Sequence, residues 1–251
     1  MTTDFDVRSA FAVISDVHGN RWALEAVLRD LDRRGVQQHI NLGDHLTGPL
    51  DPTGTAELLR QREMLCICGN DDRDLFAPAE TLSPAQRFTR EQLDPETLAW
   101  LRALPDTAVA AGEILVCHGD LFDAPYLLEQ IEPGGVWLRS TPQIEASVAA
   151  IPQQLILSGH SHVPRTVTLP DGRLLVNPGS VGLPAYTMQT PFPYAMEAGS
   201  PHARYALLHK RERSWQVELV QVPYDWAQAA RVASEHGRAD WAAWLNMGRA
   251  R

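Results

Sequence analysis

The sequence has few cysteines, a single lysine and no long apolar segment. Its three cysteines are an odd number, and no second close pair accompanies Cys66 and Cys68, which disfavours a thiolate zinc site. We interpret Cys66 and Cys68, which alternate within an apolar run, as small buried side chains on one side of a strand. Of the 22 basic residues only Lys210 is a lysine, which we attribute to genomic composition.

The sequence also lacks the features of a membrane or exported protein. No apolar run reaches the roughly 18 residues typical of a membrane span, so we expect no association with a membrane. The first residues, MTTDFDVRSA, are acidic where a signal peptide is basic. Together with the odd number of cysteines, these observations predict a protein of the reduced cytoplasm.

An excess of basic charge is absent as well. The net charge is −9, which argues against a protein that holds long nucleic acid through nonspecific attraction. Bound divalent ions could still reverse the sign of the charge at one site. The 251 residues, of which 44% are hydrophobic, fit one large domain spanning residues 1–251.

Short apolar runs alternate with helical patterns in the first half of the chain. This alternation predicts parallel β-α-β units, with strands at residues 10–15, 39–42 and 64–68 and helices at 20–34 and 55–62. Asn20 is a suitable cap for the first helix, and Gly35 a suitable end. The polar segment at about 72–105 is too long for a plain connection, so we expect a helical excursion on the surface.

The later part of the chain has a different pattern. Further strands are expected at 113–117, 154–157, 205–209 and 215–222, with a hairpin at 165–176 around Pro170-Asp171-Gly172. The chain closes with a predicted helix at about 224–247 that contains three tryptophans. We expect these tryptophans to dock the helix on the body, with a dimer contact as the alternative. The sequence specifies no oligomeric state.

Metal-binding residue types follow five of the predicted strands. They are Asp16 and His18, Asp44, Asn70, His118, and His160 and His162. Because ligands of α/β sheets lie beyond the carboxyl ends of the strands, these side chains should meet at one edge. Any single group could be an ordinary turn or helix cap. Five such groups packed together would repel or stay unsatisfied without cations, so the sequence predicts a metal site.

The ligand types narrow the choice of metal. Imidazoles, carboxylates and an amide oxygen suit manganese, iron or zinc, and we expect manganese to support activity best. Seven ligands are too many for one tetrahedral ion but suit two ions that share a carboxylate. Such ions lie about 3.5–4 Å apart, orient a phosphoryl group and activate a water between them for attack on phosphorus.

The motifs that carry these residues resemble those of the calcineurin-like metallophosphoesterase superfamily, in particular its small bacterial phosphodiesterase-like branch. The matching segments, in family order, are ISDVHGNRWALEAVL at 14–28, NLGDHLTGP at 41–49, CGND at 68–71, CHGD at 117–120, SGHSHVP at 158–164 and NPGSVGLP at 177–184. The resemblance implies an α/β fold in the form of a four-layer α/β/β/α sandwich. The C-terminal third matches only loosely.

The resemblance also implies how the ligands divide between two ions. Asp16, His18 and His162 would bind the first ion. Asn70, His118 and His160 would bind the second, and Asp44 would bridge the two.

The sequence departs from the family in one motif. The family frequently has Gly-Asn-His-Asp/Glu, whose histidine is a candidate general acid, whereas Asp71 stands at that position here. Beside metal an aspartate should be ionised, which makes it a poor proton donor. Four alternative outcomes are open: slow catalysis, a preference for good leaving groups such as aryl phosphates, a substitute acid, or lost activity. His45 is a candidate substitute, although a satisfied histidine away from the reaction explains it too, and Asp71 could simply cap a helix.

Three further segments could contribute to the site. Arg73 could contact substrate phosphate, or it could be a solvated helix residue. Gly179-Ser180 could offer backbone donors to the site, or form a tight turn that holds the chain after the hairpin. Tyr126 could shape the pocket.

The sequence therefore predicts a two-metal hydrolase of phosphomonoesters or phosphodiesters that acts on a small phosphorylated substrate, with nucleotides included. A catalytically weak, metal-bound protein that binds phosphorylated ligands is the first alternative, because the histidine is missing. A nuclease on the same scaffold is the second, which the acidic balance disfavours.

Overall fold

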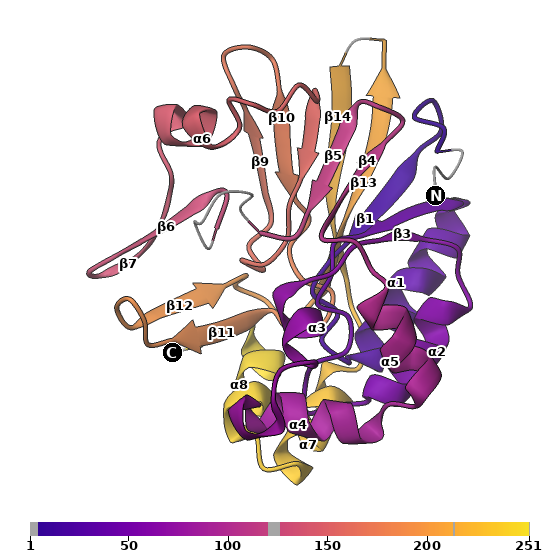
Figure 1. The fold of residues 1–251 in the computed structure, drawn as a ribbon, viewed down its shortest axis with the longest axis vertical. Coiled ribbons are helices and arrows are strands. Elements are labelled where there is room, and N and C mark those ends of the chain that lie inside the picture. The colour runs from indigo at the N-terminus through magenta and orange to yellow at the C-terminus, as the bar shows by residue number, and fades with distance from the viewer. Residues whose placement is uncertain (1–4, 120–125, 213, 251) are drawn as a thin grey trace.

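Two five-stranded sheets form the centre of the protein. The computed structural model describes residues 5–119, 126–212 and 214–250 (Figure 1). The first sheet has the order β14-β13-β1-β2-β3, with bounds β1 (Phe11–Ile14), β2 (Gln38–Asn41), β3 (Leu65–Cys66), β13 (Ala203–Arg211) and β14 (Ser214–Val222). The second has the order β4-β5-β8-β10-β9, with bounds β4 (Thr107–Ala110), β5 (Ile114–Cys117), β8 (Leu155–Leu157), β9 (Arg165–Thr168) and β10 (Leu174–Asn177).

Each sheet combines parallel and antiparallel pairs. In the first sheet β1, β2 and β3 are parallel, as the alternation along the sequence predicts, and the later strands β13 and β14 join antiparallel. In the second sheet β5, β8 and β10 are parallel, and β4 and β9 pair antiparallel at its two edges. The parallel strands place their carboxyl ends together.

The apolar alternation of β1 explains the layers. Phe11 and Val13 belong to the core between the two sheets, whereas Ala12 and Ile14 pack against helices on the other face, because successive strand residues point to opposite sides. The helices on that face are α1 (Arg21–Arg34), α2 (Pro52–Arg60) and α5 (Pro95–Arg102) (Figure 1). The short α6 (Thr141–Ser147) covers the outer face of the second sheet. The predicted four-layer α/β/β/α fold is confirmed.

Local capping determines where the helices begin. The Asn20 side chain accepts the N–H of Ala23 at 3.2 Å, and Gly35 closes α1 with φ 70°, as expected. α2 begins earlier than predicted because Asp51 caps it and Pro52 occupies its first position. The predicted excursion consists of α3 (Asn70–Asp74), a 3₁₀ turn (Ala79–Thr81), α4 (Pro84–Gln92) and α5.

The C-terminal segment differs from the single helix predicted at 224–247. It forms two helices, α7 (Trp226–Glu235) and α8 (Ala239–Met247), because Gly237 adopts φ 75° and interrupts the helical hydrogen bonding. Trp241 and Trp244 are buried in a cluster with Leu50 and Leu183, so they dock α8 on the body of the protein.

Two short ribbons were not predicted. They are β6 (Glu129–Glu132) with β7 (Gly135–Leu138), and β11 (Ala185–Met188) with β12 (Tyr194–Glu197). The second ribbon packs against α8 near the carboxyl ends of the sheets (Figure 1). Within the described ranges, no helix combines the length and the apolar character that crossing a membrane requires.

Candidate metal centre

The structure brings the seven predicted metal-binding residues to one place. They follow the ends of five strands: Asp16 and His18 after β1, Asp44 after β2, Asn70 after β3, His118 after β5, and His160 and His162 after β8. Their side chains lie where the two sheets meet, and all are buried except the half-buried Asn70 and His160. Asp120, which completes the CHGD motif, lies outside the described residues.

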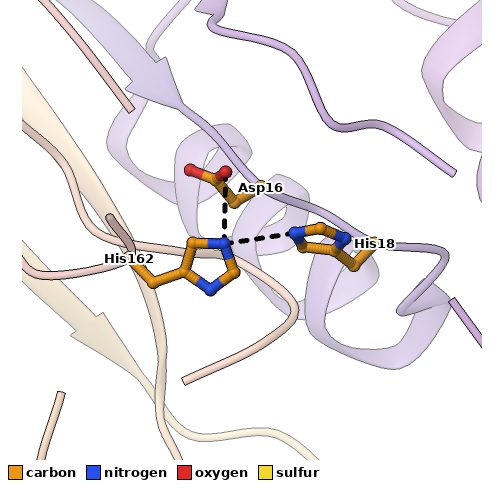
Figure 2. A group of neighbouring side chains, drawn as sticks. All are labelled: Asp16, His18 and His162. Atoms are coloured by element: carbon orange, nitrogen blue, oxygen red, sulfur yellow. Dashed lines mark hydrogen bonds and ion pairs between the residues drawn. The ribbon is translucent and has the colours of Figure 1, made fainter. Parts of the chain in front are cut away.

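The first group contains Asp16, His18 and His162, whose ligand atoms lie within 4.8 Å of one another. Figure 2 shows the three side chains converging. The Nε2 atom of His162 is 3.3 Å from Asp16 Oδ1 and 3.2 Å from His18 Nε2. This group can hold one ion with an oxygen and two nitrogen ligands.

The second group contains Asp44, His118 and His160, again with ligand atoms within 4.8 Å of one another. His118 Nε2 lies 3.2 Å from Asp44 Oδ2 and 3.1 Å from Asn70 Oδ1. Asn70 therefore faces the same point as these three side chains.

The two groups adjoin. His18 Nε2 of the first group is 3.9 Å from Asp44 Oδ2, and His118 Nε2 of the second is 3.9 Å from Asp16 Oδ1. Asp44 Oδ2 thus lies within 4 Å of a histidine from each group.

Hydrogen bonds orient three of the histidines toward the centre. The Nδ1 atoms of His18, His118 and His162 donate to the carbonyl oxygens of Thr47, Leu42 and Leu183, at 2.9, 2.7 and 2.6 Å. In the neutral ring this leaves Nε2 as an acceptor. Such a backbone bond is the usual way in which proteins fix the orientation of a metal-binding histidine.

The donor set fits cations because acceptor atoms face one another. His18 Nε2 faces His162 Nε2, and His118 Nε2 faces the oxygens of Asp44 and Asn70. Asp16 Oδ1 is buried without a hydrogen-bond partner. Only a proton or a metal ion between such atoms removes the repulsion and satisfies the buried oxygen.

The backbone is strained at the same residues. Among the described residues, seven other than glycine have positive φ, and five of them are predicted ligands: Asp16, His18, Asp44, His160 and His162, with φ of 51–68°. L residues rarely adopt this region, and strain of this kind gathers at functional sites. Gly69 and Gly159 allow close approach, since an added Cβ would lie 2.1 Å from Asp44 Oδ1 and 2.0 Å from Ser15 Oγ respectively.

The ionisation of the site reflects its paired charges. Burial would raise the pKa of Asp16, but His162 outweighs it and lowers that pKa to about 2. Burial would likewise lower the pKa of His118, but Asp44 raises it to about 10. Burial, followed by the charge of His118, lowers the pKa of His160 to about 4. The carboxylates therefore attract positive charge, and His160 stays neutral, as a metal ligand must.

Aromatic rings support three of the histidines. The ring of Tyr126 stacks on His160 with centroids 4.8 Å apart, and Tyr186 contacts His162 edge-on at 4.7 Å. Trp241 contacts His18 edge-on at 6.0 Å. The sequence indicated a role for Tyr126 at the pocket, but Tyr186 and Trp241 follow no strand-end motif and are found only in the fold.

Asp71 lies beside the centre. Its backbone N–H donates to Asp44 Oδ1 at 2.8 Å, and its carboxylate is 3.7 Å from His18 Nδ1. Burial and the Asp44 carboxylate raise the pKa of Asp71 to about 7. Bound cations would lower the pKa of Asp71. The full ionisation of Asp71 that the sequence predicts therefore depends on such cations.

His45 does not reach the reaction site as the sequence hypothesis required. Its side chain is fully buried, donates from Nδ1 to Asp72 Oδ2 at 2.7 Å and packs against Trp100. The reason is that Asp72, for which the sequence indicated no role, holds the His45 ring away from the centre. The only signal for Asp72 is its place in the Gly-Asn-Asp-Asp segment.

Arg73 and Ser180 also have structural roles. Arg73 donates to Asp106 at 2.6 Å on the surface and does not line the cavity described below, which favours the interpretation as a solvated helix residue. The Ser180 hydroxyl donates to the Asp16 carbonyl at 2.7 Å and accepts the N–H of Leu183 at 2.7 Å. The turn at Gly179-Ser180 thus fixes the chain that carries Asp16.

A cavity of about 920 Å³ opens beside the two groups. His18, Asp44, Asn70, His160 and His162 form its floor. Its walls come from α3, the start of α4, the β11–β12 ribbon and α8. The volume is at the upper end of the range for sites that bind small organic molecules.

Comparisons with known proteins agree with this geometry. The family model described as a calcineurin-like phosphoesterase superfamily domain matches residues 10–197. An uncharacterized protein of Methanocaldococcus jannaschii is 27% identical over 258 aligned residues, which cover 94% of this chain and 96% of that protein. The crystal structure of a metallophosphoesterase from Sphaerobacter thermophilus superposes with a TM-score of 0.72 at 25% identity, covering 96% of this chain and 100% of the other.

Proposed function

The chain belongs to the calcineurin-like phosphoesterase superfamily, and from this membership we propose that it hydrolyses phosphomonoesters or phosphodiesters with two divalent metal ions. Membership and the clustered aspartates and histidines support a metal-dependent phosphoesterase. The number of ions and the class of ester belong to the proposal.

One observation carries the proposal. At the centre, the Nε2 atoms of His18 and His162 face each other at 3.2 Å, and His118 Nε2 faces the Asp44 Oδ2 carboxylate oxygen at the same distance. Two separate points therefore require positive charge, and each has its own set of donor atoms.

In this proposal Asp16, His18 and His162 hold one ion, and Asn70, His118 and His160 hold the other. Asp44 belongs to both, since its Oδ2 is within 4 Å of a histidine from each group. The nitrogen and oxygen donors suit manganese, iron or zinc, with manganese favoured for activity. When bound, such a pair lowers the pKa of a water between the ions and stabilises charge on the phosphoryl oxygens.

The chain's own residues orient and enclose the substrate. Backbone carbonyls hold the imidazoles of His18, His118 and His162 in fixed positions, so the phosphoryl group meets a preorganised site. The cavity walls would contact the alcohol part of an ester bound beside the metals. Asp71 lies at the wall next to Asp44, and its backbone N–H donates to Asp44 Oδ1 at 2.8 Å, which helps to hold that carboxylate in place.

The test is turnover of p-nitrophenyl phosphate and of bis-p-nitrophenyl phosphate by purified protein reconstituted with manganese. We expect release of nitrophenol that chelation abolishes and renewed manganese restores. Asp44→Asn should lose this activity, and Asp171→Asn, a change in the exposed hairpin turn, should retain it. Absence of turnover on both esters, with two ions bound, would reject hydrolysis.

Asp71 favours a second candidate function. Because the family's candidate acid is replaced by a carboxylate, the protein could bind phosphorylated ligands through its metals without efficient turnover. Binding of inorganic phosphate without hydrolysis of either ester would identify this function.

A further inference from the structure

The cavity beside the metal centre is much larger than a phosphoryl group requires. One wall carries Tyr186 and Met188 from β11, Tyr194 from β12, and Trp241 and Trp244 from α8. We call these five residues the aromatic wall. Trp241, Trp244 and Tyr194 are only 6–9% exposed, so the parts of their rings that reach the cavity, together with the exposed Met188, give it an apolar lining that suits a planar apolar group.

Met188 shows that this wall faces open space. Its side chain is 44% exposed, although it is large and apolar and belongs to a strand. The hydroxyls of Tyr186 and Tyr194 both bond to Tyr126 Oη, at 2.9 and 2.8 Å. Because their polar atoms are already paired, what the two tyrosines offer a ligand is mainly ring surface.

The charges around the cavity restrict the ligand further. Asp71 and Asp74 also line the cavity. Both are acidic, so they would repel a free phosphate group. Among the described lining residues, Arg238 is the one arginine, and it donates from Nε and Nη2 to Asp240 at 2.9 and 2.7 Å. Phosphate groups beyond the one at the metals would thus meet carboxylates and no unpaired arginine.

We propose that the aromatic wall binds a flat aromatic ring in the alcohol part of a substrate that carries a single phosphoryl group, as in a nucleoside monophosphate or an aryl phosphate. This inference rests on the proposed function and names its substrate class. Alkyl phosphates would leave the wall uncovered, and polyphosphates would bring additional negative charge toward Asp71 and Asp74.

The test is binding to manganese-loaded protein, measured by equilibrium dialysis with the ligands checked intact afterwards. Adenosine 5′-monophosphate and ribose 5-phosphate differ only by the base, so we expect the former to bind about tenfold more tightly, the order expected for stacking. Phenyl and methyl phosphate form a second pair that detects a preference for a simple aryl group. Adenosine diphosphate should bind no more tightly than the monophosphate.

A matched pair of variants locates the effect. Met188→Ala should lower affinity for adenosine 5′-monophosphate several-fold and leave inorganic phosphate unaffected, whereas Met247→Ala, at an equally exposed methionine of α8, should change neither. Trp244→Leu should act like Met188→Ala, with its thermal unfolding checked because Trp244 is buried.

Equal affinities within both ligand pairs would contradict the proposed role of the aromatic wall. Equal affinities of the two methionine variants for adenosine 5′-monophosphate would contradict it too. If neither inorganic phosphate nor any ester binds, the proposed function is rejected, and this inference is rejected as well because it rests on that function. The phosphate measurement therefore separates the two failures.

Discussion

His45 Nδ1 donates a hydrogen bond of 2.7 Å to Asp72 Oδ2, and both side chains are fully buried. Asp72 also accepts the backbone N–H groups of Asp44, His45 and Gly69, each at 2.9 Å. One carboxylate therefore ties the turn that carries Asp44 to the helix that begins at Asn70. The pair positions residues on both sides of the second group of ligands.

Breaking this pair should destabilise the protein strongly. Asp72→Asn leaves a buried imidazolium without a counterion, so we expect the free energy of unfolding to fall by about 3–5 kcal/mol. Urea denaturation in the presence of chelator measures the change without any contribution from metal. The control is Asp106→Asn, which breaks an exposed pair with Arg73 and should cost about 0–1 kcal/mol. Similar effects from both variants would contradict the role of Asp72.

The same pair predicts how stability depends on pH. Burial would lower the pKa of His45, but Asp72 raises it from its ordinary value of 6.5 to about 10. A group whose pKa is raised by folding stabilises fully below its unfolded pKa, and the stabilisation disappears as pH rises through the folded pKa. The difference in unfolding free energy between wild type and His45→Gln should thus shrink from pH 6.5 to about pH 10. A constant difference over this window, by urea denaturation, would mean that His45 is uncharged.

Metal content should be more sensitive to Asp44 than to Asn70. Asp44 Oδ2 lies 3.2 Å from His118 Nε2 and 3.9 Å from His18 Nε2, whereas Asn70 is close only to the second group. Asp44→Ala should therefore reduce binding of both ions and Asn70→Ala of one, as measured by elemental analysis after dialysis against manganese. Asp171→Ala, in an exposed turn, is the control. Equal losses from Asp44→Ala and Asn70→Ala would rule out a shared carboxylate.

Asp71→His restores the side chain that the family frequently has at this position. If the acid is absent from the natural protein, the change should raise the rate on phenyl phosphate relative to p-nitrophenyl phosphate, by up to about 100-fold. The ratio of the two kcat/KM values is the measurement, with Asp71→Asn as the control. An unchanged ratio would show that another group already protonates the leaving oxygen.

The arrangement of the ligands was predictable because each follows a short apolar strand. FAVI, ILVC and LIL bury every residue, and the first polar side chains after them lie at the carboxyl edge. Parallel pairing then brings distant segments together, so His162 reaches Asp16 across the two sheets. The cap of α1 at Asn20 was predictable for the same reason, because it depends only on residues that are neighbours in the sequence.

The walls of the site could not be predicted in this way. Strands β11 and β12 are four residues each and flank a segment with Pro191 and Pro193, so they give a weak periodic pattern. The position of Trp241 beside His18 depends on the break at Gly237 and on packing between segments far apart in the sequence. The same holds for His45, whose orientation depends on the buried Asp72.

The most direct test is anomalous diffraction at the manganese edge from crystals of the wild-type protein grown with manganese. Two peaks should appear, one between Asp16, His18 and His162 and the other between Asn70, His118 and His160, with Asp44 beside both. No peak at this edge of the sheets, or a single peak under saturating manganese, would contradict a two-metal centre.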